Sequence, residues 1–127
     1  NLRRQRQMCI RDSSSTALIK GRWLRPGQHL DLVGSFKPNM READDEVMRR
    51  SSIYVDVKQT APRESGDLAI PMAHGVISQK DIKGDLFQLC RGEVKGRRSS
   101  QEISLFKSVG HALEDLVAAR LISQKNQ

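Results

Sequence analysis

Segments with the pattern of β-strands alternate with segments with the pattern of α-helices from residue 17 onward. The predicted strands, which are rich in β-branched or alternating apolar residues, cover residues 29–34, 52–57 and 103–106. The predicted helices cover residues 43–48, 62–66 and 82–90, with a last helix over residues 113–125. Such alternation is typical of a parallel sheet with helices packed against it. We therefore predict the α/β class.

Further expectations concern how these helices begin, end and pack. Asn39 and Glu42 have the spacing of a capping box, which predicts a helix start there. Gly66 and Gly92 are expected to end the helices that precede them. The last helix is expected to bury its apolar residues, which are Leu113, Leu116, Val117 and Leu121.

Ligands of parallel α/β sheets bind beyond the carboxyl ends of the strands. Those ends are predicted at residues 34–36, 56–58 and 107–110. A glycine such as Gly34 lets the backbone approach a flat ligand closely, and the free N–H groups at the start of the last helix favour an anion. The three histidines share no metal-ligand spacing, so we predict no metal site.

The formal net charge of +7 suggests nucleic-acid binding, but the charge distribution argues against it. Residues 1–12 hold four arginines against one aspartate, and the remaining excess is scattered apart from Lys95, Arg97 and Arg98. Aromatic residues for base stacking make up only 4% of the chain. No apolar run approaches the roughly 18 residues of a membrane span, and no signal peptide is recognisable. We predict a cytoplasmic protein that binds neither nucleic acid nor membranes.

Residues 1–16 differ in composition from the rest, being rich in Arg, Gln and Ser without a period. Residues 8–13 resemble translated sequencing-adapter text, so we interpret this tail as an artefact of a truncated gene, or else as a disordered basic tail. The partial domain then covers residues 17–127. Cys9 and Cys90 lie far apart in sequence and are expected to be free thiols.

Three short segments carry the most recognisable pattern: residues 24–42, 64–68 and 106–115. The first combines a Pro-Gly turn, a strand ending in Val-Gly-Ser and a Pro-Asn-Met-Arg-Glu loop. The second reads Glu-Ser-Gly-Asp-Leu, and the third begins Phe-Lys-Ser-Val-Gly. In this order, they resemble the ornithine cyclodeaminase/mu-crystallin family of NAD(P)-linked enzymes.

The resemblance implies the second half of a Rossmann-type parallel sheet, with a C-terminal helix that returns to a substrate and dimerisation domain. It also implies NAD or NADP as cofactor, a small imine or amino-acid substrate, and a homodimer when full length. The matching positions imply cofactor contacts from Val33, Gly34, Ser35, Lys107 and Ser108. They place on the substrate side Phe36, Val109 and Gly110. No catalytic residue is assigned to this part of the chain.

The chain departs from the family pattern at Phe36. The cyclodeaminase and an alanine dehydrogenase of the family have an aspartate there that is thought to exchange protons. A phenyl ring cannot do so. We therefore expect an imine reductase that transfers hydride to the C=N bond of a 1-pyrroline-2-carboxylate-like ketimine. The alternatives are a cyclodeaminase, an amino-acid dehydrogenase, or a non-catalytic small-molecule binding protein of the mu-crystallin kind.

No G-x-G-x-x-G sequence occurs in the 127 residues. The phosphate-binding first βαβ unit of a dinucleotide domain, and the family's amino-terminal substrate residues, are therefore expected to lie outside this chain. We expect the chain alone to be inactive and to bind no dinucleotide measurably. The choice between NAD and NADP would depend on a residue in that other half.

Overall fold

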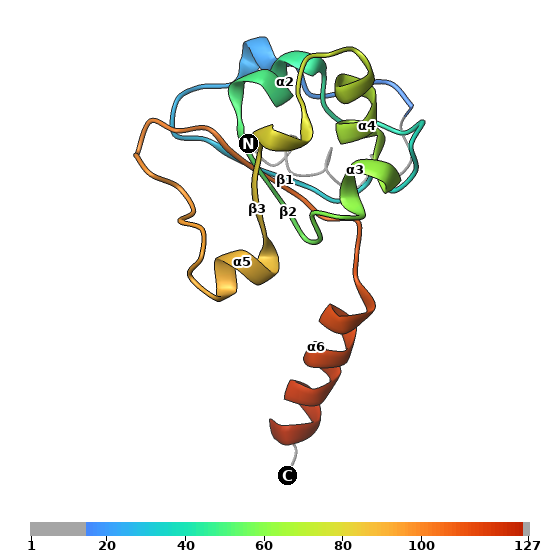
Figure 1. The fold of residues 1–127 in the computed structure, drawn as a ribbon, viewed down its shortest axis with the longest axis vertical. Coiled ribbons are helices and arrows are strands. Elements are labelled where there is room, and N and C mark those ends of the chain that lie inside the picture. Colours follow the sequence, from blue (N-terminus) through green and yellow to red (C-terminus); the bar gives the residue numbers. More distant parts are fainter. Residues whose placement is uncertain (1–14, 126–127) are drawn as a thin grey trace, which may run out of the picture.

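A computed structural model describes residues 15–125 (Figure 1). Four strands form one parallel sheet in the order β1-β4-β2-β3. They are β1 (His29–Leu32), β2 (Ser52–Val55), β3 (Ile82–Asp85) and β4 (Ser104–Lys107). Parallel pairing throughout confirms the predicted α/β class. The expectations for residues 1–14, including Cys9, lie outside the described residues, whereas Cys90 is a free, exposed thiol.

One face of the sheet carries the apolar core. Because side chains alternate along a strand, every second residue points to this face: Leu30 and Leu32, Ile53 and Val55, and Leu105. Helices α2 (Asp45–Arg50), α3 (Ala61–Glu64) and α4 (Gly66–Ala73) pack against it. Their buried contributions are Val47, Met48, Ala61 and Leu68. These three helices therefore cover only the core face of the sheet.

The segment 82–90, predicted as one helix, is a strand followed by a helix. β3 ends at Asp85, and α5 covers Leu86–Cys90. The prediction was wrong because apolar residues at helical spacing also fit a short strand that runs into a helix. The boundary is a capping box, in which Asp85 Oδ1 accepts from Gln88 N at 2.9 Å and Gln88 Oε1 accepts from Asp85 N at 3.2 Å.

Gly66 begins a helix rather than ending one, which corrects a second expectation. The preceding helix α3 ends at Glu64, and α4 starts directly after Ser65. The Ser65 side chain accepts a hydrogen bond from Asp67 N at 3.3 Å and so caps α4. Two short 3-10 helices, η2 (Gly21–Trp23) and η3 (Gln79–Asp81), complete the body of the domain.

Helix α2 starts at Asp45, two residues after the start of the predicted range, and its N-cap is Asp44. The helix start predicted from the Asn39–Glu42 capping box is therefore wrong. Asp44 Oδ1 accepts from Val47 N at 3.0 Å and from Gly21 N at 2.9 Å. We expect Asp44→Ala to lower the free energy of unfolding by about 1–2 kcal/mol in urea titrations, since a helix cap and a link to η2 are both lost. Asn39→Ala is the control and should change it by less than about 0.5 kcal/mol.

The last helix, α6 (Ala112–Lys125), projects away from the body of the domain (Figure 1). The prediction that it buries its apolar side chains is wrong for the described residues, because these side chains stay exposed even where three of them line a hollow beside α5. Their exposed fractions are Leu113 42%, Leu116 63%, Val117 50% and Leu121 56%. Within residues 15–125, no helix combines the length and apolarity that crossing a membrane requires.

Candidate functional site at the carboxyl ends of the strands

The carboxyl ends of β1 and β4 lie side by side. Leu32 pairs with Lys107 at the last position of the register, and Ser108 N donates to Leu32 O at 3.0 Å. The residues that follow the two strands therefore share one edge of the sheet, as the parallel arrangement predicts. We define the carboxyl-end surface as the five residues Val33, Phe36, Ser108, Val109 and Gly110.

None of the five residues of the carboxyl-end surface is charged, and three of them, Val33, Phe36 and Val109, have apolar side chains. Val33 is 61% exposed and Phe36 51% exposed, and Lys37 Nζ lies 5.8 Å from the centre of the Phe36 ring. Ser108 and Val109 are half-buried and Gly110 is exposed. Such a surface suits a flat ring with apolar faces better than a phosphate. Among residues 15–125, no group of three or more His, Cys, Asp and Glu could hold a metal ion.

Ser35 and Lys107 lie beneath this surface rather than on it. Ser35 is 1% exposed, and its Oγ donates to Met40 O at 2.6 Å. Lys107 is fully buried, and its Nζ donates to Leu32 O at 3.3 Å. Gly34 is buried as well, and its N–H donates to Glu42 Oε2 at 3.0 Å. Three of the eight residues implied by the family resemblance thus support the surface from within.

Two buried carboxylates face the Lys107 ammonium. Its Nζ lies 3.8 Å from both Glu42 Oε2 and Asp67 Oδ2. Burial lowers the pKa of Lys107 from its ordinary value, while the carboxylates of Asp67, Glu42 and Asp56 act in the opposite direction. Asp67 Oδ2 is buried and accepts no hydrogen bond within the part of the chain that the structure describes. Lys107 therefore supplies the compensating charge for these carboxylates.

The Glu-Ser-Gly-Asp segment fixes the loop that carries Phe36. Asp67 Oδ1 accepts from Glu42 N at 2.8 Å and from Ala43 N at 3.0 Å, so it ties the end of the loop to the start of α4. Gly66 N donates to Lys37 O at 3.0 Å, which ties down the beginning. The Glu-Ser-Gly-Asp segment therefore anchors the loop at both ends and also caps α4.

Sequence reasoning missed the burial of three carboxylates, which are Glu42, Asp56 and Asp67. It predicted a role only for Glu42, as part of a capping box. The position of Asp56 directly after a strand was the available signal. Its Oδ2 accepts from Val109 N and from Gly110 N, both at 2.8 Å. These two N–H groups, in the turn before α6, are therefore occupied by a carboxylate of the same chain. At the helix start itself, His111 Nδ1 accepts from Leu113 N at 3.2 Å.

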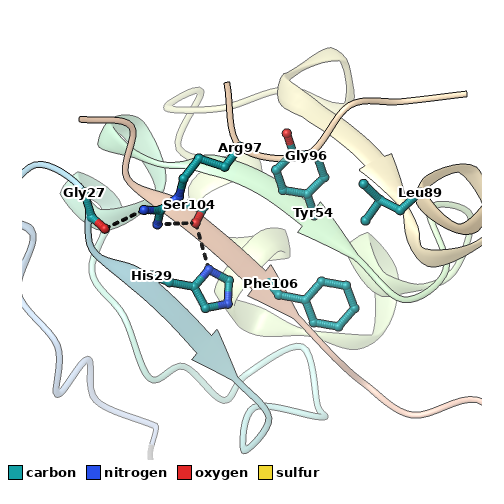
Figure 2. Close-up of a pocket in the computed structure, with 8 residues that line it drawn as sticks. All are labelled: Gly27, His29, Tyr54, Leu89, Gly96, Arg97, Ser104 and Phe106. Atoms are coloured by element: carbon teal, nitrogen blue, oxygen red, sulfur yellow. Dashed lines mark hydrogen bonds between the residues drawn. The ribbon is translucent and has the colours of Figure 1, made fainter. Parts of the chain in front are cut away.

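A separate hollow of about 550 Å³ lies on the opposite face of the sheet (Figure 2). Tyr54, Phe106 and Leu89 form its apolar wall. At one end, Arg97 donates to Gly27 O at 2.7 Å and to Ser104 Oγ at 2.9 Å, while His29 Nδ1 lies 2.8 Å from Ser104 Oγ. These hydrogen bonds occupy the Arg97 guanidinium and attach the 91–103 loop to Gly27 and Ser104. The hollow is away from the carboxyl ends, where parallel sheets bind ligands.

The sequence model of the ornithine cyclodeaminase/mu-crystallin family matches residues 8–127. The chain is 46% identical over 112 residues to Protein SAR DEFICIENT 4 of Arabidopsis thaliana, a match that covers 88% of this chain and 34% of the plant protein. It is 43% identical over 107 residues to a Delta(1)-pyrroline-2-carboxylate reductase of Paracoccus denitrificans, covering 84% and 34% of the two chains.

Among solved structures, the Thermococcus litoralis Delta(1)-pyrroline-2-carboxylate reductase in complex with NADH and L-proline superposes with a TM-score of 0.84 at 42% identity. That match covers 89% of this chain and 35% of the archaeal chain. The chain therefore spans about a third of the length of the relatives it matches. This structural similarity agrees with the predicted part of a nucleotide-binding α/β fold.

Proposed function

Because this chain belongs to the ornithine cyclodeaminase/mu-crystallin family, we propose that it forms part of an NAD(P)H-dependent reductase of a cyclic imine. The substrate class is a ketimine like 1-pyrroline-2-carboxylate. One observation carries the proposal: Phe36 is 51% exposed on the loop after β1, where it offers the substrate an apolar face and no proton. The identity to the Paracoccus denitrificans reductase supports the same reaction.

The carboxyl-end surface would hold the nicotinamide end of the cofactor beside the imine. Val33 and Ser108 contact the cofactor in this proposal, and the buried Gly34 holds the backbone between β1 and Phe36. Ser35 and Lys107 contribute through the loops that they fix, since both side chains are buried. Phe36, Val109 and Gly110 lie on the substrate side and exclude water from the C=N bond.

The bound nicotinamide supplies the hydride, which is chemistry that no side chain can provide. The residues of this chain orient the imine carbon and keep the surface uncharged. A cationic imine would meet no carboxylate on this surface, because Glu42, Asp56 and Asp67 are buried and face inward. Proton delivery to the imine nitrogen is therefore proposed to come from residues outside this chain.

Assembly and location are part of the same proposal. The exposed apolar face of α6, formed by Leu113, Leu116, Val117 and Leu121, supports burial against a substrate and dimerisation domain. We propose a homodimer at full length and a cytoplasmic location. Whether the cofactor is NAD or NADP stays open in this proposal.

The direct test uses a protein of the relatives' length that contains this sequence, called the full-length form below. We expect it to oxidise NADH or NADPH when 1-pyrroline-2-carboxylate is added, with proline as the product. Ornithine should release no ammonia, since the chain has Phe36 where a cyclodeaminase needs an aspartate. Ammonia release without imine reduction would favour the cyclodeaminase alternative. Tight cofactor binding with no turnover of any cyclic imine would favour a binding protein.

A second prediction concerns the 127-residue chain alone. Titration with NADH or NADPH should give no saturable binding in the micromolar range, monitored by protein or nicotinamide fluorescence. The carboxyl-end surface contacts only the nicotinamide end in our proposal, and the sequence has no G-x-G-x-x-G loop for the pyrophosphate. A micromolar dissociation constant would contradict this division of the cofactor site.

A further inference from the structure

Asp56 links three elements at the carboxyl end of the sheet. It directly follows β2 and is fully buried. Its backbone N donates to Lys107 O at 3.4 Å, and its backbone O accepts from Leu86 N at 3.3 Å. One carboxylate oxygen, Oδ1, accepts from Val57 N at 2.9 Å. Asp56 is therefore held by its backbone and by Oδ1, and these contacts fix the direction in which Oδ2 points.

The second oxygen, Oδ2, accepts three hydrogen bonds from the turn after β4. Val109 N and Gly110 N both donate at 2.8 Å, and Ser108 Oγ donates at 3.4 Å. Distances near 2.8 Å are typical of bonds to an ionised acceptor, which are stronger than bonds between neutral groups. Asp56 Oδ2 thus accepts all three of the hydrogen bonds that this turn donates to Asp56.

Two successive backbone N–H groups that point at one acceptor form a nest, a conformation that binds anions. Gly110 has a φ of 91°, in the left-handed region where glycine is favoured, and this bends the chain toward Asp56. In phosphate-binding loops such a nest holds a ligand anion. Here it is a side chain of the same protein, so the turn cannot hold a ligand phosphate or carboxylate at these two amides. Its shape is set instead by Asp56.

We propose that Asp56 is a positioning residue, whose carboxylate replaces a ligand anion in the Ser108–Gly110 turn and sets where Ser108 and Val109 stand against cofactor and substrate. This inference rests on the proposed function for its catalytic consequence. Its structural part, the carboxylate-filled turn, is independent of which imine is reduced. Misplacing a reacting geometry by even a small distance lowers the rate of the chemical step more than it weakens binding.

The first test compares Asp56→Asn and Asp56→Ala in the full-length form. Asparagine keeps the size but loses the charge, so we expect kcat to fall about tenfold with KM for the imine changed less than about threefold. The kcat of the alanine variant should fall further than that of Asp56→Asn. Sodium formate should restore part of this kcat, because formate can enter the emptied nest. Sodium chloride at the same ionic strength should not. Asp81→Asn, at an exposed position at the end of η3, is the matched control.

The second test uses the 127-residue chain, so that it does not depend on activity. In Asp56→Asn, hydrogen exchange of the Val109 and Gly110 amides should become at least about tenfold faster, while core amides in β2 and β4 keep their rates. Unchanged exchange at these two amides, or an Asp56→Asn enzyme with full kcat, would overturn the inference. A wild-type full-length form that reduces no imine would instead overturn the proposed function and the catalytic consequence drawn from it, whatever the amides show.

Discussion

Replacing Lys107 by methionine is expected to lower the free energy of unfolding of this chain by about 3–5 kcal/mol. The side chain is fully buried, and its Nζ lies 3.8 Å from the carboxylates of both Glu42 and Asp67. Methionine is similar in length but removes the ammonium that lies 3.8 Å from both carboxylates, and Asp67 Oδ2 is buried and accepts no hydrogen bond among the described residues. Urea denaturation followed by circular dichroism measures the effect.

Two variants make this expectation specific. Lys83→Met removes an exposed lysine from β3 and should change stability by less than about 0.5 kcal/mol. Adding Asp67→Asn to Lys107→Met should recover part of the loss, because asparagine keeps an oxygen for the amides of residues 42 and 43 without the charge. If Lys107→Met lowered the free energy of unfolding by less than about 1 kcal/mol, and by no more than Lys83→Met does, the Lys107 ammonium would not stabilise the two buried carboxylates.

Replacing Gly66 by alanine should cost about 3 kcal/mol and should loosen the loop that carries Phe36. A Cβ at this position would overlap the carbonyl oxygen of Met40 and would lie 2.6 Å from the carbonyl oxygen of Pro38. Both obstacles are backbone atoms, so no side chain can move aside. The start of α4 and the loop can therefore relieve the overlap only by separating, which breaks the Gly66 N to Lys37 O hydrogen bond.

Gly96→Ala is the matched control, since the nearest atom to a Cβ there is Leu89 Cδ2 at 4.0 Å. It should leave stability within about 0.5 kcal/mol of the wild type. In the full-length form, Gly66→Ala should also raise KM for the imine, because Phe36 loses its fixed position. Equal stability of the two alanine variants would mean that the loop does not dock on α4 as the structure describes.

Much of the sheet could be predicted from periodicity because its strands are short, apolar and separated by turns. β1, β2 and β4 were predicted within two residues of their ends. β3 was missed, since Ile82 and Leu86 also fit a helical period and only the Asp85–Gln88 capping box marks the boundary. The last helix was predicted in type but not in environment, because burial depends on what lies against a helix and not on its own sequence.

The location of the candidate site followed from a general rule about parallel sheets, and the positions after β1 and β4 do share one edge. That rule does not predict which of these residues are buried and which are exposed. The resemblance implied a cofactor contact for Lys107, and its side chain lies in the interior beside Glu42 and Asp67, which come from distant parts of the sequence. Contacts between such distant carboxylates leave no periodic pattern, so sequence reasoning had no means to pair them.

Chemical-shift mapping of backbone amides in the full-length form, titrated with NADH or NADPH and then with L-proline, locates the binding site directly. We expect the largest changes on Val33, Ser108, Val109 and Gly110, at the carboxyl ends of β1 and β4. We expect little change around the hollow on the opposite face, at Tyr54 and the Arg97 loop. Large changes around that hollow, with the amides after β1 and β4 unmoved, would contradict the proposed site.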